Sequence, residues 1–513
     1  MEGLTHLAAA FVHFATVETL ANVVWATAIG IIIGMLPGLT ATMGIALVTT
    51  LTYTTAHDQA ILILVCVYNG AIYGGSRSAI LLNIPGTPAN AATTLDGFPL
   101  ARQGRAGEAM AIATSGSALG TLVGVLFMAI VAPALADVAL SFGSFEFFWL
   151  AIFGVVIAGQ MTSFDDPLKG WIAGFIGLLV AMIGQEGIHA EPRFTFGILD
   201  LEGGIGLIPA LVGAFGLSEI IGVMIQKRAE MASTKAQVVL PRLIDMWRYR
   251  ATILRSGVIG TFVGIIPGVG EDIASWISYA AARRRSRERH LFGKGSTEGL
   301  MAAETGNNAC APGAIIPVLT LAIPGSAPAA VLLAALFIHG VRPGPMIMIE
   351  APHVVFQMVV MFVLSTIAMA AIGIAAVKPM LMILKVSRER LMPAVFVLCV
   401  IGPYALTNRL FDIWVMLFFG VLGFVMRELK YPMAPLVLGI ILGDILDKSL
   451  RRSLTLTDGD LLPFFTRPIS MILVAVTLLT ILAGVPPVRR AVSALWARVD
   501  WRKRPEETGA RMS

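Results

Sequence analysis

Residues 83–97, NIPGTPANAATTLDG, interrupt a chain that is otherwise strongly apolar, and a shorter version, AIPGSAPAA, returns at residues 322–330. Pro and Gly close together end or bend a helix. In a lipid bilayer each unpaired backbone group is costly, so such a break persists only where protein or a water-filled cavity covers it. The two breaks therefore predict a covered polar site inside an apolar molecule.

The composition of the chain is that of a membrane protein. Of its 513 residues 57% are hydrophobic and 13% are charged, whereas about 25% of the residues of a soluble domain are charged. We therefore expect an all-α polytopic membrane protein with about 12 transmembrane segments, several of them broken helices or hairpins with Pro and Gly in the middle. The apolar runs lie at 20–53, 59–84, 107–135, 145–163, 167–183, 203–226, 251–282, 298–338, 351–377, 391–407, 411–426, 432–447 and 466–485.

Basic residues gather in four segments, at 227–250, 283–289, 378–390 and 489–504. The positive-inside rule assigns such segments to the cytoplasm. For ARRRSRER we favour a solvated loop that obeys this rule, with a lipid-headgroup or nucleic-acid site as the alternative. The net charge of +5 then reflects topology, and we expect no nucleic-acid partner.

The second half of the chain repeats landmarks of the first half in the same order. Four such blocks are hard to obtain by chance. We predict a first repeat at 1–226, a cytoplasmic connecting loop at 227–250, a second repeat at 251–452, and a C-terminal transmembrane helix with a basic tail at 453–513. The blocks pair Gly34, Pro37 and Gly38 with Gly264, Pro267 and Gly268; Asn69, Gly74, Pro85 and Gly86 with Asn308, Gly313, Pro324 and Gly325; Gly159 and Trp171 with Gly402 and Trp414; and Pro209 and Gly213 with Pro435 and Gly439.

The charges also predict how the two repeats are oriented. Counting spans away from the basic loops places Arg102 and Arg105 inside the cell and the equivalent loop around Arg342 outside, so the repeats are inverted relative to each other. The same count places the basic C-terminus in the cytoplasm. One segment disagrees, because KSLRR at residues 448–452 falls outside.

Inverted repeats with discontinuous helices at matching places indicate a secondary transporter whose site lies where the repeats meet. Each break leaves a half-helix, and the positive N-terminus of that half-helix suits a substrate carboxylate. Arg77 lies deep in an apolar run, where burying its charge costs free energy. Its guanidinium could equally pair with a substrate carboxylate, pair with an internal acid, or snorkel to the membrane surface. The predicted substrate-binding residues are Asn83, Pro85, Gly86, Thr87, Asn90, Thr93, Pro324, Gly325, Ser326 and Arg77.

Acidic residues inside apolar segments are candidates for ion or proton coupling. Glu271 and Asp272 rank first because they follow a Pro and Gly break that is itself repeated. Asp96, Glu219, Glu304 and Asp444 are the other candidates. For each of the six acids we favour a partner of a buried basic group or a helix-end charge over a coupling role. Cations can use backbone carbonyls freed at a break, so the full predicted ion-coupling set is Gly38, Gly268, Glu271, Asp272 and Asn308. We predict no catalytic residue and no metal site, since Cys66, Cys310 and Cys399 lack metal-ligand spacing.

Four longer stretches carry a resemblance to a known family that extends to about residue 485. They are GMLPGLTATMG from residue 34, YNGAIYGGSRSAILLNIPGTPANAATTLDGFPLARQG from 68, GIIPGVGEDIASWISYA from 264, and ETGNNACAPGAIIPVLTLAIPGSAPAAVLLAAL from 304. They resemble the large membrane subunit of the tripartite tricarboxylate transporters, the TctA family. These motifs are long, and the likeness is much more specific than any single short pattern.

The resemblance implies a multi-pass protein of the bacterial inner membrane that works with a small membrane subunit and a periplasmic substrate-binding protein. It implies import of an organic carboxylate, such as citrate or a related acid, driven by a Na⁺ or proton gradient without ATP. The chain contains no GxxxxGK[ST] loop, and we expect no cofactor.

Two other classes of protein remain to be weighed. An anion channel would also use helix breaks and small polar residues, and it is the alternative to a carrier. An intramembrane enzyme would need paired catalytic groups. It is disfavoured, because the chain has no HExxH motif and LGD at residues 442–444 lacks the extra glycine of the aspartyl type. We therefore expect a transporter that works by alternating access and is not an enzyme.

Overall fold

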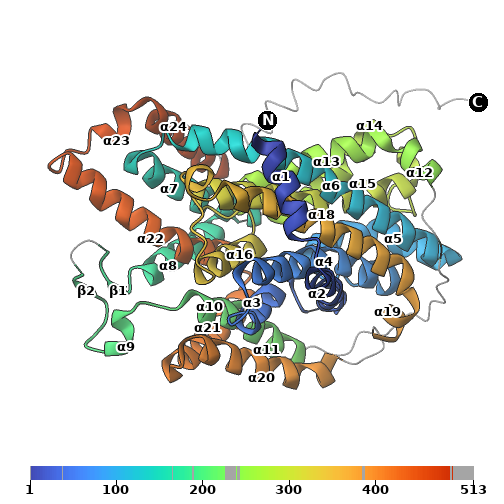
Figure 1. Cartoon of the computed structure of the whole chain (residues 1–513), viewed down its shortest axis with the longest axis horizontal. Helices are drawn as coiled ribbons and strands as arrows, with labels where there is room; N and C mark the ends of the chain where they lie inside the picture. The colour runs from blue at the N-terminus through green and yellow to red at the C-terminus, as the bar shows by residue number, and fades with distance from the viewer. Residues whose placement is uncertain are drawn as a thin grey trace, which may run out of the picture.

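The computed structural model of the protein describes residues 2–36, 38–163, 166–187, 190–225, 239, 243–383, 388–485 and 488. Almost all of the regular structure in this part of the chain is helical (Figure 1). Much of the predicted connecting loop at 227–250, and nearly all of the predicted basic tail after residue 485, lie outside the described residues.

The elements of the first half run from the N-terminus to residue 225. A short antiparallel pair of strands, β1 (Gly184–Gln185) and β2 (Pro192–Arg193), projects from one end of the molecule (Figure 1). The helices are α1 (Glu2–His13), α2 (Val17–Met35), α3 (Ala41–Leu51), α4 (His57–Leu82), η1 (Pro88–Asn90), α5 (Ala91–Leu100), η2 (Ala101–Arg105), α6 (Ala106–Ala139), α7 (Ser144–Thr162), α8 (Pro167–Ala181), α9 (Leu199–Glu202), α10 (Leu207–Leu211), η3 (Val212–Leu217) and α11 (Ser218–Ile225).

The second half contains helices only among its described residues. They are α12 (Leu243–Arg248), α13 (Arg250–Ile265), α14 (Gly270–Arg285), η4 (Arg289–Leu291), α15 (Thr297–Leu321), α16 (Ala327–Ile338), α17 (Ile347–Glu350), α18 (Pro352–Ala375), α19 (Val377–Ile383), α20 (Arg388–Thr407), α21 (Leu410–Glu428), α22 (Met433–Leu456), α23 (Pro463–Thr466) and α24 (Pro468–Gly484).

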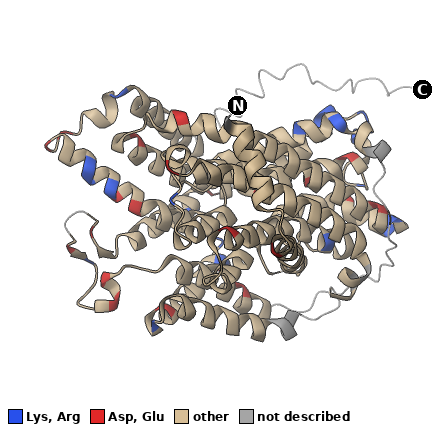
Figure 2. Ribbon diagram, in the orientation of Figure 1, with Lys and Arg blue, Asp and Glu red and all other residues tan. Residues whose placement is uncertain are grey.

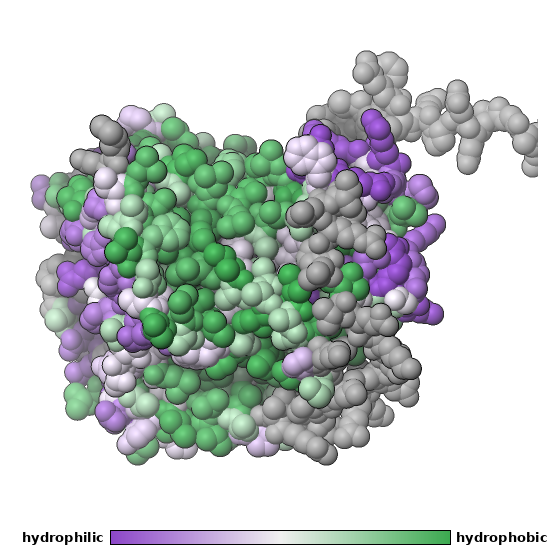
Figure 3. All heavy atoms as spheres, turned by 45° about the vertical axis from the view of Figure 1, so that its right-hand side comes forward, coloured by the Kyte–Doolittle hydropathy of each residue, from purple (hydrophilic) through white to green (hydrophobic). Residues whose placement is uncertain are grey.

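The helices confirm the prediction of an all-α polytopic membrane protein. Among the described residues, seven helical segments are long and apolar enough to cross a bilayer, and five shorter helices are also apolar. Much of the face in Figure 3 is apolar, with hydrophilic residues gathered toward its edges. Among these seven segments the one with α4 is the most enclosed, since 94% of its apolar window is buried. A helix that is apolar all round belongs in the core.

Small residues bring the central helices into backbone contact in the same way in both halves. A Cβ atom at Gly34 of α2 would lie 1.9 Å from the carbonyl oxygen of Ala71 on α4. A Cβ atom at Gly264 of α13 would lie 2.4 Å from the carbonyl oxygen of Cys310 on α15. Helices in membranes associate through such small residues, because lipid supplies little hydrophobic drive. The helix pairs α2–α4 and α13–α15 are therefore built alike.

The remaining helices cross between the halves. The long α6 of the first half packs along α15 of the second half, and α18 of the second half packs on α4 of the first half. In the same manner α22 packs on α8, and α21 packs on η3. Both of these last contacts are close, because a Cβ atom at Gly439 or at Gly213 would lie 2.2 Å from a carbonyl oxygen of the facing helix. The two halves are thus interlocked; their inverted orientation stays a prediction.

Charged residues lie toward two opposite ends of the molecule (Figure 2). At the end that carries the strands, two basic residues of α22 are paired with acids. Lys448 lies 2.8 Å from Asp444, Arg451 lies 3.1 Å from Asp447, and Arg193 of β2 lies 2.9 Å from Asp447.

Candidate functional site

The repeated breaks have the same backbone conformation. α4 ends at Asn83 and α15 ends at Ala322, and both residues have a φ of 57° in the left-handed region. Asn tolerates this region, whereas Ala rarely enters it. The same backbone break thus forms at both places, even though Ala322 is poorly suited to the left-handed conformation.

Glycine follows each break because another helix end lies against it. A Cβ atom at Gly86 would lie 2.0 Å from the carbonyl oxygen of Gly34, and one at Gly325 would lie 1.9 Å from the carbonyl oxygen of Gly264. Neither backbone atom can move aside as a flexible side chain could. The two glycines therefore let each break pack on the helix that precedes it in its own half.

A second pair of breaks lies between α2 and α3 and between α13 and α14. Gly38, Gly268 and Gly270 have positive φ angles of 100°, 71° and 73°. Thr40 caps the N-terminus of α3, where its hydroxyl accepts a hydrogen bond from the N–H of Met43, and α14 begins at Gly270. These turns place two more helix N-termini in the interior.

A cavity of about 280 Å³ lies where the four breaks meet. The first turns of α3, α14 and α16 and the short helix η1 all contribute to its wall, so residues of both halves surround it. Helix N-termini present unpaired N–H groups and a positive dipole end, which favour an anion. The lining includes Thr40, Thr42, Ile72, Thr87, Thr162, Phe215, Gly268, Glu271, Asp272, Pro328 and Met433.

Two adjacent acids in the first turn of α14 have different surroundings. Glu271 is 3% exposed, and its Oε1 accepts hydrogen bonds from the hydroxyl of Tyr68 on α4 and, at 2.9 Å, from the hydroxyl of Ser326 at the start of α16. Asp272 also lines the cavity, and its side chain is exposed there. The cavity thus holds one buried, hydrogen-bonded acid and one open acid.

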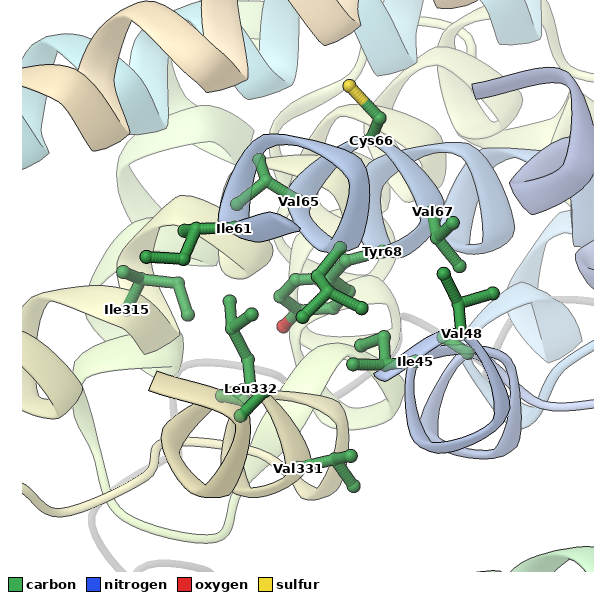
Figure 4. Close-up of a cluster of buried hydrophobic side chains, with 14 of the residues drawn as sticks. Ile45, Val48, Ile61, Val65, Cys66, Val67, Tyr68, Ile315, Val331 and Leu332 are labelled. Carbon is green, nitrogen blue, oxygen red and sulfur yellow. The ribbon is translucent and has the colours of Figure 1, made fainter. Parts of the chain in front are cut away.

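The ring of Tyr68 lies in an apolar cluster that fixes its position. Figure 4 shows it among Ile45, Val331 and Leu332, which belong to the largest buried cluster of the described residues. Its hydroxyl lies 3.1 Å from the hydroxyl of Ser326. Tyr68 therefore links α4 of the first half to the acid and the hydroxyl of the second half.

Asn90 and Thr93 lie next to a different acid. The hydroxyls of Thr93 and Ser117 donate to the fully buried carboxylate of Glu304 on α15, the second at 2.8 Å. Asn90 is also buried and contacts Thr87. The structure places these two predicted residues behind the cavity wall, where they join α5 to α15 and α6.

Arg77 is likewise held inside the protein. It is fully buried, its Nη1 donates to the carbonyl oxygen of Met110 at 3.1 Å, and its Nη2 donates to the hydroxyl of Thr114 at 2.6 Å. The guanidinium lies 4.4 Å from the centre of the Tyr73 ring. Arg77 joins α4 to α6 and does not line the cavity.

The other predicted residues fall into two groups. Thr87, Gly268, Glu271 and Asp272 line the cavity, and Ser326 reaches Glu271 at its edge. The remainder do not line it. In this second group Asn83 is exposed, Pro85, Gly86, Pro324 and Gly325 shape the breaks, Gly38 approaches Glu219, and Asn308 is buried with its amide 4.0 Å from the sulfur of Met369.

Reasoning from sequence missed Tyr68, Thr40 and Thr42. Tyr68 stands at the start of YNGAIYGG, and a phenol in an apolar run is itself a signal of a buried partner. Thr40 and Thr42 follow the Pro and Gly break that matches the one before Glu271. Within the described residues no three His, Cys, Asp or Glu side chains come together to hold a metal ion.

The chain was compared with known families and proteins. Residues 20–438 match the family described as tripartite tricarboxylate transporter TctA. An uncharacterised 52.8 kDa protein from the TAR-I ttuC' 3' region of Agrobacterium vitis is 33% identical over 498 residues, which are 95% of this chain and 98% of that protein. An uncharacterised protein from the TAR-II ttuC' 3' region of the same organism is 31% identical over 231 residues, 45% of this chain and 96% of that protein.

Proposed function

The chain belongs to the tripartite tricarboxylate transporter TctA family, and from this premise we propose that it is the large permease subunit of a secondary transporter that imports a small organic carboxylate. The observation that carries the proposal is the cavity at which helix N-termini of both halves meet. Its volume of about 280 Å³ is close to the lower end of small-molecule sites. A di- or tricarboxylate such as citrate is the substrate class that we propose.

The two acids explain why transport would be coupled to a cation. A carboxylate substrate held by helix N-termini would lie beside Glu271 and Asp272, and like charges this close repel one another. A proton on one acid, or a Na⁺ ion between acid and substrate, removes the repulsion. The substrate then binds well only together with its coupling ion, which is the condition for symport.

Alternating access would involve the two groups of elements around the cavity. One group consists of the breaks, with Thr87, Gly268 and Pro328. The other consists of Thr162 at the end of α7, Phe215 of η3, and Met433 at the start of α22. Rigid-body movement of one group against the other would expose the cavity on either side in turn.

Membership of the family supports a tripartite system with other subunits. We propose that the chain works in the bacterial inner membrane with a small membrane subunit and with a periplasmic binding protein that delivers the carboxylate. We propose no cofactor and no catalytic role; the gradient of Na⁺ or protons supplies the energy.

The test is uptake of labelled di- and tricarboxylates into proteoliposomes that contain this chain and its small subunit. Uptake is measured with and without the binding protein, under separate Na⁺ and proton gradients. Asp272→Asn is expected to abolish gradient-driven accumulation, because it removes the open acid from the cavity. Asp137→Asn is the matched control, since Asp137 is exposed on α6 and does not line the cavity. Rapid flux that needs neither the binding protein nor a gradient would instead identify a channel.

A further inference from the structure

A second cavity, of about 490 Å³, lies at the opposite end of α14 from the acids. We call it the arginine groove. Its wall is formed by the last turns of α14, by α5 and by η4. The residues that concern us are Arg283, Arg284, Arg289, Trp276, Tyr279 and Leu95. This is the end of the molecule at which the ribbon of α14 is coloured for Lys and Arg in Figure 2.

The acids near the groove are already engaged elsewhere. Oδ1 of Asp96 accepts hydrogen bonds from the backbone N–H groups of Gly293, Gly295 and Ser296, and its Oδ2 accepts one from the hydroxyl of Tyr279 at 2.9 Å. Glu288 is paired with Arg248, and Glu298 accepts hydrogen bonds from the hydroxyls of Thr252 and Ser286.

Among the described residues, no acid lines the groove itself. Arg283, Arg284 and Arg289 have exposed side chains, and in the described part of the chain none of the three forms an ion pair with a carboxylate. Arg289 uses its Nε to bind the carbonyl oxygen of Ser286 at 3.2 Å. The groove thus gathers positive charge that the described protein does not neutralise.

Apolar surface continues from the arginines along α14. Trp276 is 45% exposed and Ile277 is 43% exposed, about two turns before Arg283 and Arg284. A tryptophan with arginines beyond it matches the order of groups at a membrane surface, where indole rings lie at the level of the headgroups and cations lie toward water. A small soluble anion would not contact the apolar part of this surface.

We propose that the arginine groove binds the phosphate group of an anionic phospholipid, with its acyl chains along Trp276 and Ile277. Guanidinium groups bind phosphate oxygens through two parallel hydrogen bonds, and three arginines line this groove. The hydrogen bonds of Asp96 to Tyr279 and to the loop after η4 hold the wall in place before the lipid arrives. A lipid in the groove would fix the far end of the helix whose first turn lines the central cavity.

Binding is measured by native mass spectrometry of the full chain in detergent, titrated separately with phosphatidylglycerol and phosphatidylcholine. The double variant Arg283→Gln/Arg284→Gln is compared with Arg285→Gln/Arg287→Gln, which removes the same charge from exposed residues outside the groove. The groove variant is expected to lose affinity for phosphatidylglycerol by about fivefold for each arginine. The control variant is expected to retain wild-type affinity, and phosphatidylcholine is expected to bind more weakly to both.

Three results would overturn the proposal. Equal losses in both double variants would show attraction by general charge alone. Equal affinity for the two lipids would show that the anionic headgroup is not recognised. Displacement of phosphatidylglycerol by inorganic phosphate would assign the groove to soluble phosphates.

A second measurement leaves the arginines unchanged. The tryptophan fluorescence of the wild type and of Trp276→Phe is measured in vesicles that contain brominated phosphatidylglycerol. Quenching that is present in the wild type and missing in Trp276→Phe reports lipid at the groove. An absence of that difference would also overturn the proposal. Both measurements are independent of the transport function.

Discussion

Glu271 and Asp272 are neighbours in the sequence, yet they have different surroundings. Successive residues of a helix point about 100° apart, so one carboxylate reaches Tyr68 and Ser326 while the other opens into the cavity. A buried acid that accepts two hydroxyl donors is held in one position. The roles that we propose follow from this difference: Asp272 contacts the substrate or its cation, and Glu271 responds to the state of the site.

The first prediction concerns the buried acid. Glu271→Gln keeps the size of the side chain and removes its negative charge, so we expect uptake to lose most of its dependence on the coupling ion. Tyr68→Phe removes one donor and leaves the charge, so we expect the ion dependence to remain and to shift. The measurement is the initial rate of uptake as Na⁺ and pH are varied separately. An unchanged ion dependence in Glu271→Gln would clear this residue of the coupling role.

Some of the residues predicted from the sequence line the cavity, and others lie away from it. Glu271, Asp272 and Thr87 follow directly after breaks, and local sequence is enough to put them at helix N-termini. Arg77 lies in a helix that is buried on all sides, and Thr93 is fully buried in α5. Periodicity cannot tell which face of such a segment meets a cavity, because every face is apolar or covered.

At the scale of the elements, the paired breaks were predictable because their cause is local. Pro and Gly end a helix wherever they stand, and the two halves carry them at matching places. The left-handed residue before each break was not predictable at Ala322, where contacts with other elements outweigh the intrinsic preference of alanine. The glycine contacts between helices also depend on partners about 40 residues away or more, which no local pattern reveals.

The second prediction tests these helix contacts. Gly34→Ala and Gly264→Ala each push a Cβ atom against a backbone carbonyl group, at 1.9 and 2.4 Å, and overpacking of this kind costs roughly 1–3 kcal/mol. We expect both variants to lower the midpoint of thermal unfolding in detergent. Gly203→Ala is the matched control, because its nearest heavy atom would be the flexible Arg409 side chain at 3.4 Å. Equal stability of all three variants would contradict the packing described here.

At the scale of the whole molecule, the internal repeat was visible in the sequence and the interlocking was not. Matching blocks reveal that two segments resemble each other, but they do not say which helix packs on which. The contacts of α6 with α15 and of α18 with α4 run between the halves. Such pairings are fixed by the fit of side chains across long sequence separations, so only the structure reveals them.

The third prediction follows from this interlocking. A protease site inserted between residues 230 and 236 would divide the chain between its halves. We expect the two fragments to remain together through size-exclusion chromatography in mild detergent, because helices of each half pack against helices of the other. The uncut protein provides the reference elution volume. Separate elution of the fragments would show that the contacts between the halves are too weak to hold them.

Interlocking also sets a waiting time during synthesis. The amide of Asn69 on α4 donates to the hydroxyl of Ser365 on α18 at 2.6 Å, and the two residues are 296 positions apart. At about 5–20 residues per second, a ribosome needs roughly 15–60 s to make that distance. Throughout this interval α4, which is almost wholly enclosed in the folded protein, is in the membrane without one of its final neighbours. The Asn69 amide therefore lacks its Ser365 partner until α18 has been made. Assembly during synthesis thus constrains this fold as well as transport does.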